Sequence, residues 1–147
     1  MYKISVTGEK AAAARIGAVR AAVPGMLGTA IVAAGQPVKG LAQGFAPYKT
    51  GTLRRSIHVG EAFVIGKTAA CEVGTNLVYA AAQEFGAHIE PKNYPFLHWV
   101  TDDGTDVFVW HGVDIPPHPY MRPAADQGQP LAVAAFGRAF GLLMGRV

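Results

Sequence analysis

The sequence has little cysteine, little charge and no evident run of about 18 apolar residues. Cys71 is the single cysteine among 147 residues, so no disulfide can form within the chain, which fits a reducing compartment. Its apolar, strand-like surroundings favour a buried and inert thiol over a nucleophile. Without a long apolar run, we expect neither a secretory signal nor a membrane span.

Charged residues make up only 16% of the chain and hydrophobic residues 50%, which is enough apolar material for a core and excludes a disordered chain. We therefore expect residues 1–147 to form one domain of common size. The net charge of +3 is mild, and the positive charges are scattered apart from Lys49, Arg54 and Arg55. This pattern favours a solvated surface over a dedicated nucleic-acid-binding surface.

Helices are predicted at both ends of the chain. Residues 9–22 are rich in alanine, and Pro24-Gly25 should break or kink the helix before a second stretch, from residue 26 to about 45. That second stretch contains Pro37 and several glycines, so it needs a packing partner, which in an assembly could be another subunit. A last helix is expected from residue 122 onward, interrupted at Gly128 and Pro130 and strongest over residues 131–144.

The middle of the chain has the pattern of short strands. Residues 53–73 contain strand-type residues punctuated by glycine, which predicts two or three antiparallel strands, and residues 78–86 predict a short helix that Gly86 ends. Residues 96–110 predict a hairpin with a two-residue turn at Asp103-Gly104, so that Trp99 faces Phe108. The expected fold is α+β: a small, mostly antiparallel sheet with hairpins, packed by a long N-terminal helix, with a kink expected, and a C-terminal helix.

Several catalytic motifs are present only in part. Lys49-Thr50-Gly51 occurs in serine acyl-enzymes together with Ser-x-x-Lys, which this chain lacks. Residues 60–68 resemble a phosphate-binding loop, but five residues rather than four separate the two glycines. Residues 102–106 mimic the start of a calcium loop without its later oxygen ligands. No nucleophile, base and oxyanion site can be assembled, so we expect no enzyme and no cofactor.

Two histidines leave one alternative open. With the hairpin turn at residues 103–104, His98 and His111 lie on the same face as diagonal neighbours, within reach of one metal ion. A third close ligand is not evident, so half-exposed sheet residues are the favoured interpretation. A metal-dependent enzyme using His98 and His111 remains the least favoured alternative.

Three stretches occur in a recognisable order: APYKTGTLRRSI at residues 46–57, VGTNLVYAAAQEFGAHI at 73–89 and PPHPYMRPAAD at 116–126. Together they resemble a family of tailed-bacteriophage tail components, also described as tail-completion or head–tail joining proteins. The resemblance covers about residues 45–127, and Tyr120 stands where that family usually has Phe. The residues singled out as interface or structural positions are Pro47, Lys49, Thr50, Gly51, Leu53, Arg54, Arg55, Ser56, Tyr79, Glu84, Phe85, Gly86, Pro119, Arg122 and Pro123.

The resemblance implies a non-enzymatic virion protein, made in the host cytoplasm, at the neck or the head-proximal end of the tail. It implies a ring of identical subunits, with a hexamer favoured, whose partners are the tail-tube protein and the head connector or stopper. An alternative is a neck-lumen protein whose Lys49, Arg54 and Arg55 contact DNA phosphates. On the structural interpretation, Thr50-Gly51 makes a turn between helix and strand, and Arg54 or Arg55 pairs with Glu84.

Overall fold

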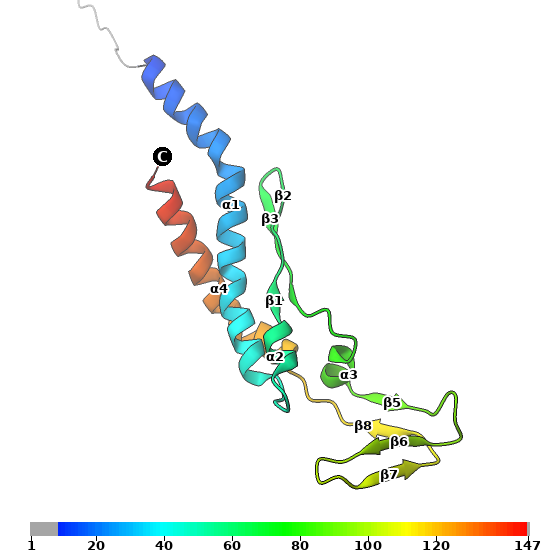
Figure 1. Cartoon of the computed structure of the whole chain (residues 1–147). Helices are drawn as coiled ribbons and strands as arrows, with labels where there is room; N and C mark the ends of the chain where they lie inside the picture. Colours follow the sequence, from blue (N-terminus) through cyan, green and yellow to red (C-terminus); the bar gives the residue numbers. More distant parts are fainter. Residues whose placement is uncertain (1–8, 147) are drawn as a thin grey trace, which may run out of the picture.

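The structure, a computed structural model, describes residues 9–146 and has the predicted α+β composition. The helices are α1 (Glu9–Phe45), α2 (Thr52–Ser56), α3 (Ala80–Phe85) and α4 (Met121–Met144). The strands are β1 (His58–Val59), β2 (Phe63–Ile65), β3 (Thr68–Ala70), β4 (Val73–Gly74), β5 (Ala87–Ile89), β6 (Leu97–Val100), β7 (Asp106–Val109) and β8 (Val113–Ile115). Figure 1 shows α1 and α4 side by side, with the strands on one side and beyond one end of the pair.

The long N-terminal helix is continuous, although its sequence contains Pro24 and Pro37. The prediction of two separate stretches is therefore wrong, whereas the alternative of a kink agrees with Figure 1, where the blue N-terminal part leans away from the rest. A proline removes one backbone hydrogen bond and bends a helix without ending it when the flanking turns hold. The C-terminal helix likewise runs through Gly128 and Pro130 and starts at Met121.

By length and composition alone, α1 is long and apolar enough to cross a membrane, although no run of about 18 apolar residues was evident in the sequence. The same property is found in helices that pack within or between proteins. Only 11% of the residues in its most apolar window are buried in this chain. Much of the apolar surface of α1 is therefore left uncovered by the chain itself.

The eight strands form four separate antiparallel ladders rather than one sheet: β1 with β4, β2 with β3, β5 with β8, and β6 with β7. The predicted antiparallel pairing is confirmed, but the described strands, each of two to four residues, do not join into one shared sheet. The first two ladders pack against α1. The other two, with their connections, make up residues 87–115, called the arm below, which projects from the helices (Figure 1).

The β6–β7 hairpin has a register one residue away from the predicted one. Trp99 pairs with Val107, and His98 pairs with Phe108. The turn is longer than two residues: the Gly104 N–H donates to the Thr101 carbonyl at 3.0 Å, and the Thr101 N–H donates to the Thr105 carbonyl at 2.9 Å. Gly104 has a φ of 84°, as expected for the last position of a three-residue loop.

The side chain of Asp103 explains why the longer loop forms. Its carboxylate accepts hydrogen bonds from the Thr101 hydroxyl and, at 3.4 Å, from the Thr105 N–H. These bonds close the loop around Asp103 and lower the pKa of its carboxyl group. The residue pair Asp103-Gly104 was correctly placed in the turn, but its side-chain bonds were not anticipated.

The buried core is small and lies where the end of α1 meets α2, α3 and the start of α4. Ile57 and Tyr120 are its largest fully buried side chains, with 1% and 2% of their surface exposed. The rest of the cluster is Ala42, Ala46, Leu53, Ala80 and Ala124. Alanines allow the elements to approach closely, so the core depends on close backbone packing more than on large side chains.

Cys71 packs against α1 near Ile31 and Gly35 and is half-buried. Its thiol donates to the Ile31 carbonyl at 3.2 Å, and burial raises its pKa. A raised pKa reduces the thiolate fraction, which agrees with the predicted inert thiol.

We predict that Gly128→Ala destabilises the protein, because α4 crosses α1 at this glycine. A Cβ atom at Gly128 would lie 2.8 Å from Cγ2 and 3.3 Å from Cα of Val38. The clash should outweigh the gain in helix propensity and lower the free energy of unfolding by about 1–2 kcal/mol. Urea unfolding measures the change. Gly137→Ala in the same helix is the matched control, since nothing lies within 4 Å of its Cβ position; equal effects of both substitutions would contradict the prediction.

Candidate functional site

The three stretches singled out in the sequence meet at one place. Each contributes to the small core: Leu53 from the first, Ala80 from the second and Tyr120 from the third. Residues that are far apart in the sequence are therefore brought together as a structural junction of α1, α2, α3 and α4. We describe this junction as the candidate functional site.

The carboxylate of Glu84, on α3, lies at the N-terminus of α4. Its Oε2 accepts hydrogen bonds from the backbone N–H groups of Tyr120 at 2.7 Å and Met121 at 2.8 Å. Its Oε1 accepts a third, from the N–H of Arg122 at 3.0 Å. Glu84 is the one buried charged side chain in the described residues, with 7% of its surface exposed.

This arrangement accounts for every unpaired donor at the start of α4. A helix leaves its first four N–H groups without partners. Tyr120, Met121 and Arg122 give theirs to Glu84, and the fourth position is Pro123, which has no N–H. A negative charge at this end of a helix is also favoured by the helix dipole. Pro123, Arg122 and Glu84 thus belong to one capping arrangement.

The predicted pairing of Arg54 or Arg55 with Glu84 is wrong. Both carboxylate oxygens of Glu84 are taken by α4, and no ion pair of Arg54 or Arg55 occurs within residues 9–146. Arg54 instead donates from Nε to the Ala46 carbonyl at 2.8 Å, and its Cζ lies 5.1 Å from the centre of the Tyr48 ring. Backbone donors satisfied the buried carboxylate, so no arginine was needed there.

Two opposing effects set the pKa of Glu84. Burial raises the pKa, but the three backbone hydrogen bonds and the positive charge of Arg122 lower it more, so the net shift is downward. The neighbouring Tyr120 hydroxyl has its pKa raised, first by burial and then by the charge of Glu84. Glu84 is therefore charged in the folded protein at neutral pH, and its charge is part of the structure.

Gly86 ends α3 as predicted and fixes the path of the chain into the arm. Its φ is 78°, and a Cβ atom there would lie 2.8 Å from the carbonyl oxygen of Ile115. The Gln83 carbonyl accepts a hydrogen bond of 2.7 Å from the His118 N–H. The two ends of the arm are thus held side by side. Pro119 lies exposed in the extended segment that follows, and Phe85 is exposed on α3.

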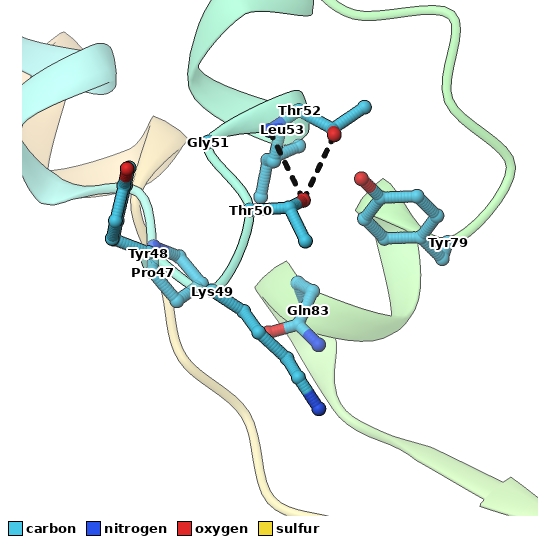
Figure 2. Close-up of a pocket in the computed structure, with 9 residues that line it drawn as sticks. All are labelled: Pro47, Tyr48, Lys49, Thr50, Gly51, Thr52, Leu53, Tyr79 and Gln83. Carbon is cyan, nitrogen blue, oxygen red and sulfur yellow. Dashed lines mark hydrogen bonds between the residues drawn. The ribbon is translucent and has the colours of Figure 1, made fainter. Parts of the chain in front are cut away.

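A pocket of about 340 Å³ opens beside the junction. Residues 47–53 line one side, and Tyr79 and Gln83 of the second stretch line the other (Figure 2). The Thr50 hydroxyl lies 2.8 Å from that of Thr52 and accepts the Thr52 N–H at 3.4 Å. The local backbone bond predicted for Thr50 is confirmed, but the turn leads into helix α2 and not into a strand.

The short helix α2 is held by its neighbours. Gln43 on α1 donates to the carbonyl of Arg54 at 2.9 Å and, more weakly, to that of Ile57 at 3.4 Å. Ser56 bonds the Leu53 carbonyl at 2.7 Å and the Thr75 hydroxyl at 2.6 Å. The sequence pattern alone could not distinguish this short helix from a strand. The role of Gln43 was missed because no sequence motif includes this residue.

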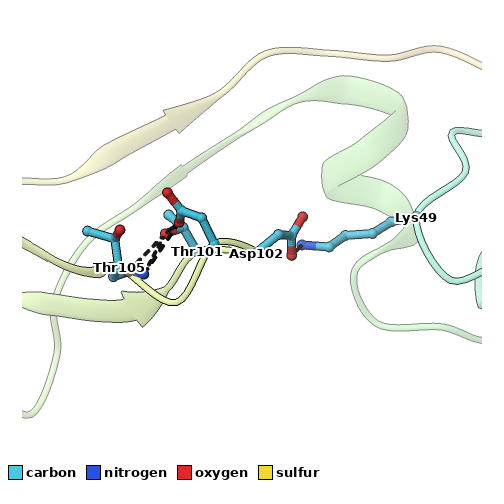
Figure 3. A network of polar contacts seen from close by, with 5 residues as sticks. Lys49, Thr101, Asp102 and Thr105 are labelled. Carbon is cyan, nitrogen blue, oxygen red and sulfur yellow. Dashed lines mark hydrogen bonds and ion pairs between the residues drawn. The ribbon is translucent and has the colours of Figure 1, made fainter.

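Lys49 links the junction to the arm. Its Nζ lies 2.8 Å from Oδ1 of Asp102 in the β6–β7 loop (Figure 3). Both side chains are mostly exposed, so this ion pair contributes only about 0–1 kcal/mol. Lys49 is exposed but paired with Asp102, and Arg54 bonds the Ala46 carbonyl, so Arg55 is the one exposed cation of the predicted basic cluster without a described ion pair. This arrangement gives little support to a DNA-contacting loop here.

The arrangement does not support the metal alternative. The corrected register stacks His98 on Phe108, and His98 Nε2 lies 2.7 Å from Asp106 Oδ1. His111 lies beyond the end of β7, outside the paired residues of the hairpin. Across residues 9–146 there is no cluster of three or more His, Cys, Asp or Glu side chains suited to a metal ion.

We predict that Glu84→Gln lowers the free energy of unfolding by about 1–3 kcal/mol at neutral pH, because the charged acceptor of three backbone bonds is lost. The folded-state pKa of Glu84 lies below its ordinary value of 4.5. Its stabilisation should therefore be complete above that value and be lost as pH falls through the folded-state pKa. Urea unfolding at a series of pH values measures this.

Glu72→Gln is the matched control, since Glu72 is exposed. It should change stability by less than about 0.5 kcal/mol. The difference between wild type and Glu84→Gln should shrink in acid. A difference that stays constant from neutral to strongly acidic pH would rule out the charged cap.

Comparison with known proteins identifies the family of this chain. Residues 10–86, more than half of the chain, match the model of a family described as "Bacteriophage HK97-gp10, putative tail-component". The match includes the first stretch and residues 73–86 of the second, and it ends at Gly86, before the arm and the third stretch. No curated protein and no solved structure matched the chain. The chain belongs to the HK97-gp10-like family of bacteriophage tail components.

Proposed function

We propose that the protein is a structural component of the virion that forms a ring at the neck or the head-proximal end of the tail. The ring, with six copies favoured, completes the tail tube and joins it to the head connector. It works through complementary surfaces, without catalysis and without a cofactor. Membership of a tail-component family supports the virion setting, and the surface of the subunit supports assembly.

The observation that carries the proposal is the large surface of the single chain. The accessible surface is 10,851 Å² for a mass of 15.4 kDa. A compact monomer of this mass exposes about 7,200 Å². Residues 1–8 and 147 could contribute at most about 1,400 Å² even as unfolded chain, so an excess of about 2,000 Å² remains.

An excess of this size fits a subunit with two interfaces. A standard interface buries about 800 Å² on each partner, and a ring subunit has two different faces, so about 1,600 Å² would be buried per copy. Large apolar side chains are exposed on most elements, among them Ile16 on α1, Ile65 on β2, Trp110 in the arm and Leu142 on α4. In the proposed ring, neighbouring subunits cover these surfaces, including the apolar surface of α1.

The junction supports a scaffold role. Its most restricted residues, Glu84, Gly86 and Tyr120, are occupied with holding helices and the ends of the arm together. Both carboxylate oxygens of Glu84 are held by backbone N–H groups, and within the described residues no fully buried side-chain nitrogen or oxygen lacks a hydrogen-bond partner. An internally satisfied junction keeps a subunit rigid, which a ring of repeated contacts requires.

The proposal predicts a ring in solution or on addition of the tail-tube protein. Light scattering gives the mass, and electron microscopy gives the symmetry, each with and without tail-tube protein, which is also examined alone as the control. Tails prepared without this protein should become able to join heads when it is added. A chain that stays monomeric under all these conditions and never restores joining would refute the proposal.

A further inference from the structure

The arm has an open aromatic face. Phe96 packs edge-on against Phe108 and Trp110, with ring centroids 5.4 and 5.2 Å apart. His98 stacks on Phe108, with centroids 4.5 Å apart, and Tyr94 extends the cluster, 6.5 Å from Phe96. Phe108 and Trp110 nevertheless have 54% and 63% of their surface exposed. The aromatic rings pack against one another, and the rest of the chain leaves them largely exposed.

The arm has few means of stability on its own. It consists of two-stranded ladders, and an isolated two-stranded ladder is marginal in water unless it packs on something else. Besides its two chain connections, its described ion pair to the rest of the protein is the exposed Lys49–Asp102 contact. Figure 1 shows the arm beyond the lower end of the helix pair, far from the free end of α1. The aromatic face therefore cannot be covered by the helices of its own chain.

The arm and the helices carry opposite charge. The arm contains one lysine, Lys92, and five acidic residues: Glu90, Asp102, Asp103, Asp106 and Asp114. With neutral histidines its formal charge is −4. Helices α1 and α4 together contain six basic and two acidic residues, a formal charge of +4. Such complementarity favours contact between the arm of one molecule and the helices of another.

The helices also offer the apolar surface that the aromatic face requires. On α1, Ile16 is 69% exposed, and Arg20 lies four residues later, which places both side chains on one side of the helix. On α4, Leu131 and Leu142 are 49% and 69% exposed, and the helical spacing places Arg138 on the same side as both of them. Apolar groups flanked by arginine suit a partner that is aromatic and acidic.

We propose that the aromatic face of the arm docks on the α1–α4 helix pair of a second copy of this chain. The inference rests on the proposed ring and specifies its contact: each copy gives its arm to one neighbour and its helices to the other. The contact is heterologous, so it repeats around a closed ring. It buries the exposed aromatic rings against apolar helix surface and places the acidic arm beside Arg15, Arg20 and Arg138.

Two variants separate the two faces. Phe108→Ala with Trp110→Ala removes the aromatic face, and Arg15→Glu with Arg20→Glu and Arg138→Glu reverses the charge of the helices. Each variant alone should weaken self-association at least about tenfold, as measured by sedimentation velocity. Mixed together, they should form a 1:1 complex that grows no further, because one supplies an intact arm and the other intact helices.

Phe63→Ala with Ile65→Ala is the matched control, because it removes two exposed apolar side chains from another hairpin. It should leave assembly unchanged. Circular dichroism checks that each variant is folded, and Trp110→Ala alone replaces the double variant if that variant is not. The 1:1 complex should also weaken as salt is raised.

The outcomes separate this contact from the ring itself. If wild type assembles and the arm variants assemble equally well, the arm contact is wrong and the ring stands. If the mixed variants remain separate, the head-to-tail pairing is wrong. If wild type assembles only with the tail-tube protein, the same variants are compared under that condition. Arm variants that then assemble and join tails to heads as well as wild type overturn the arm contact, while leaving the proposed function in place.

Discussion

The structure depends on the bond between the Glu84 carboxylate and the start of α4. A core made largely of alanine gives little burial energy to fix the angle between helices, so a directional contact has to do so. Three backbone N–H groups point to one charged group, and Pro123 removes the fourth donor that would otherwise need water. These bonds fix the position of α3 relative to α4, although the two helices are distant in the sequence. This fixed arrangement of α3 and α4 determines the junction, the pocket beside it and the place where the two ends of the arm meet.

The sequence was sufficient to predict the kinds of element and their order. The sequence predicted helices at both ends, the end of α3 at Gly86 and a turn at residues 103–104. Each of these features depends on local preferences of the backbone. The family resemblance was also readable, since it is carried by short stretches of sequence. The two prolines of α1 were harder, because whether a helix bends or ends depends on how the flanking turns pack.

The partners of the polar side chains could not be predicted. Charge suggested an arginine for Glu84, whereas the available donors were backbone groups at a helix start whose position depends on the tertiary fold. The hairpin register failed by one residue because Asp103 makes side-chain bonds that favour a longer loop. That shift of one residue pairs His98 with Phe108, so the register from which the metal hypothesis was argued does not occur. The alternation of residues predicts which side chains share a face of a strand, but the length of the turn decides which residues of the two strands pair.

The two ends of the arm are fixed at the junction, which has a consequence for the direction of the arm. Gly86 touches Ile115, Gln83 bonds His118, and Glu84 holds Tyr120, so the chain leaves and re-enters the helical body at almost the same point. Residues 87–115 therefore form a closed excursion, whose two ends are fixed at one place by the same residues that cap α4. A displacement of this place moves the whole arm as one unit, so the geometry of the junction also sets the direction in which the arm projects.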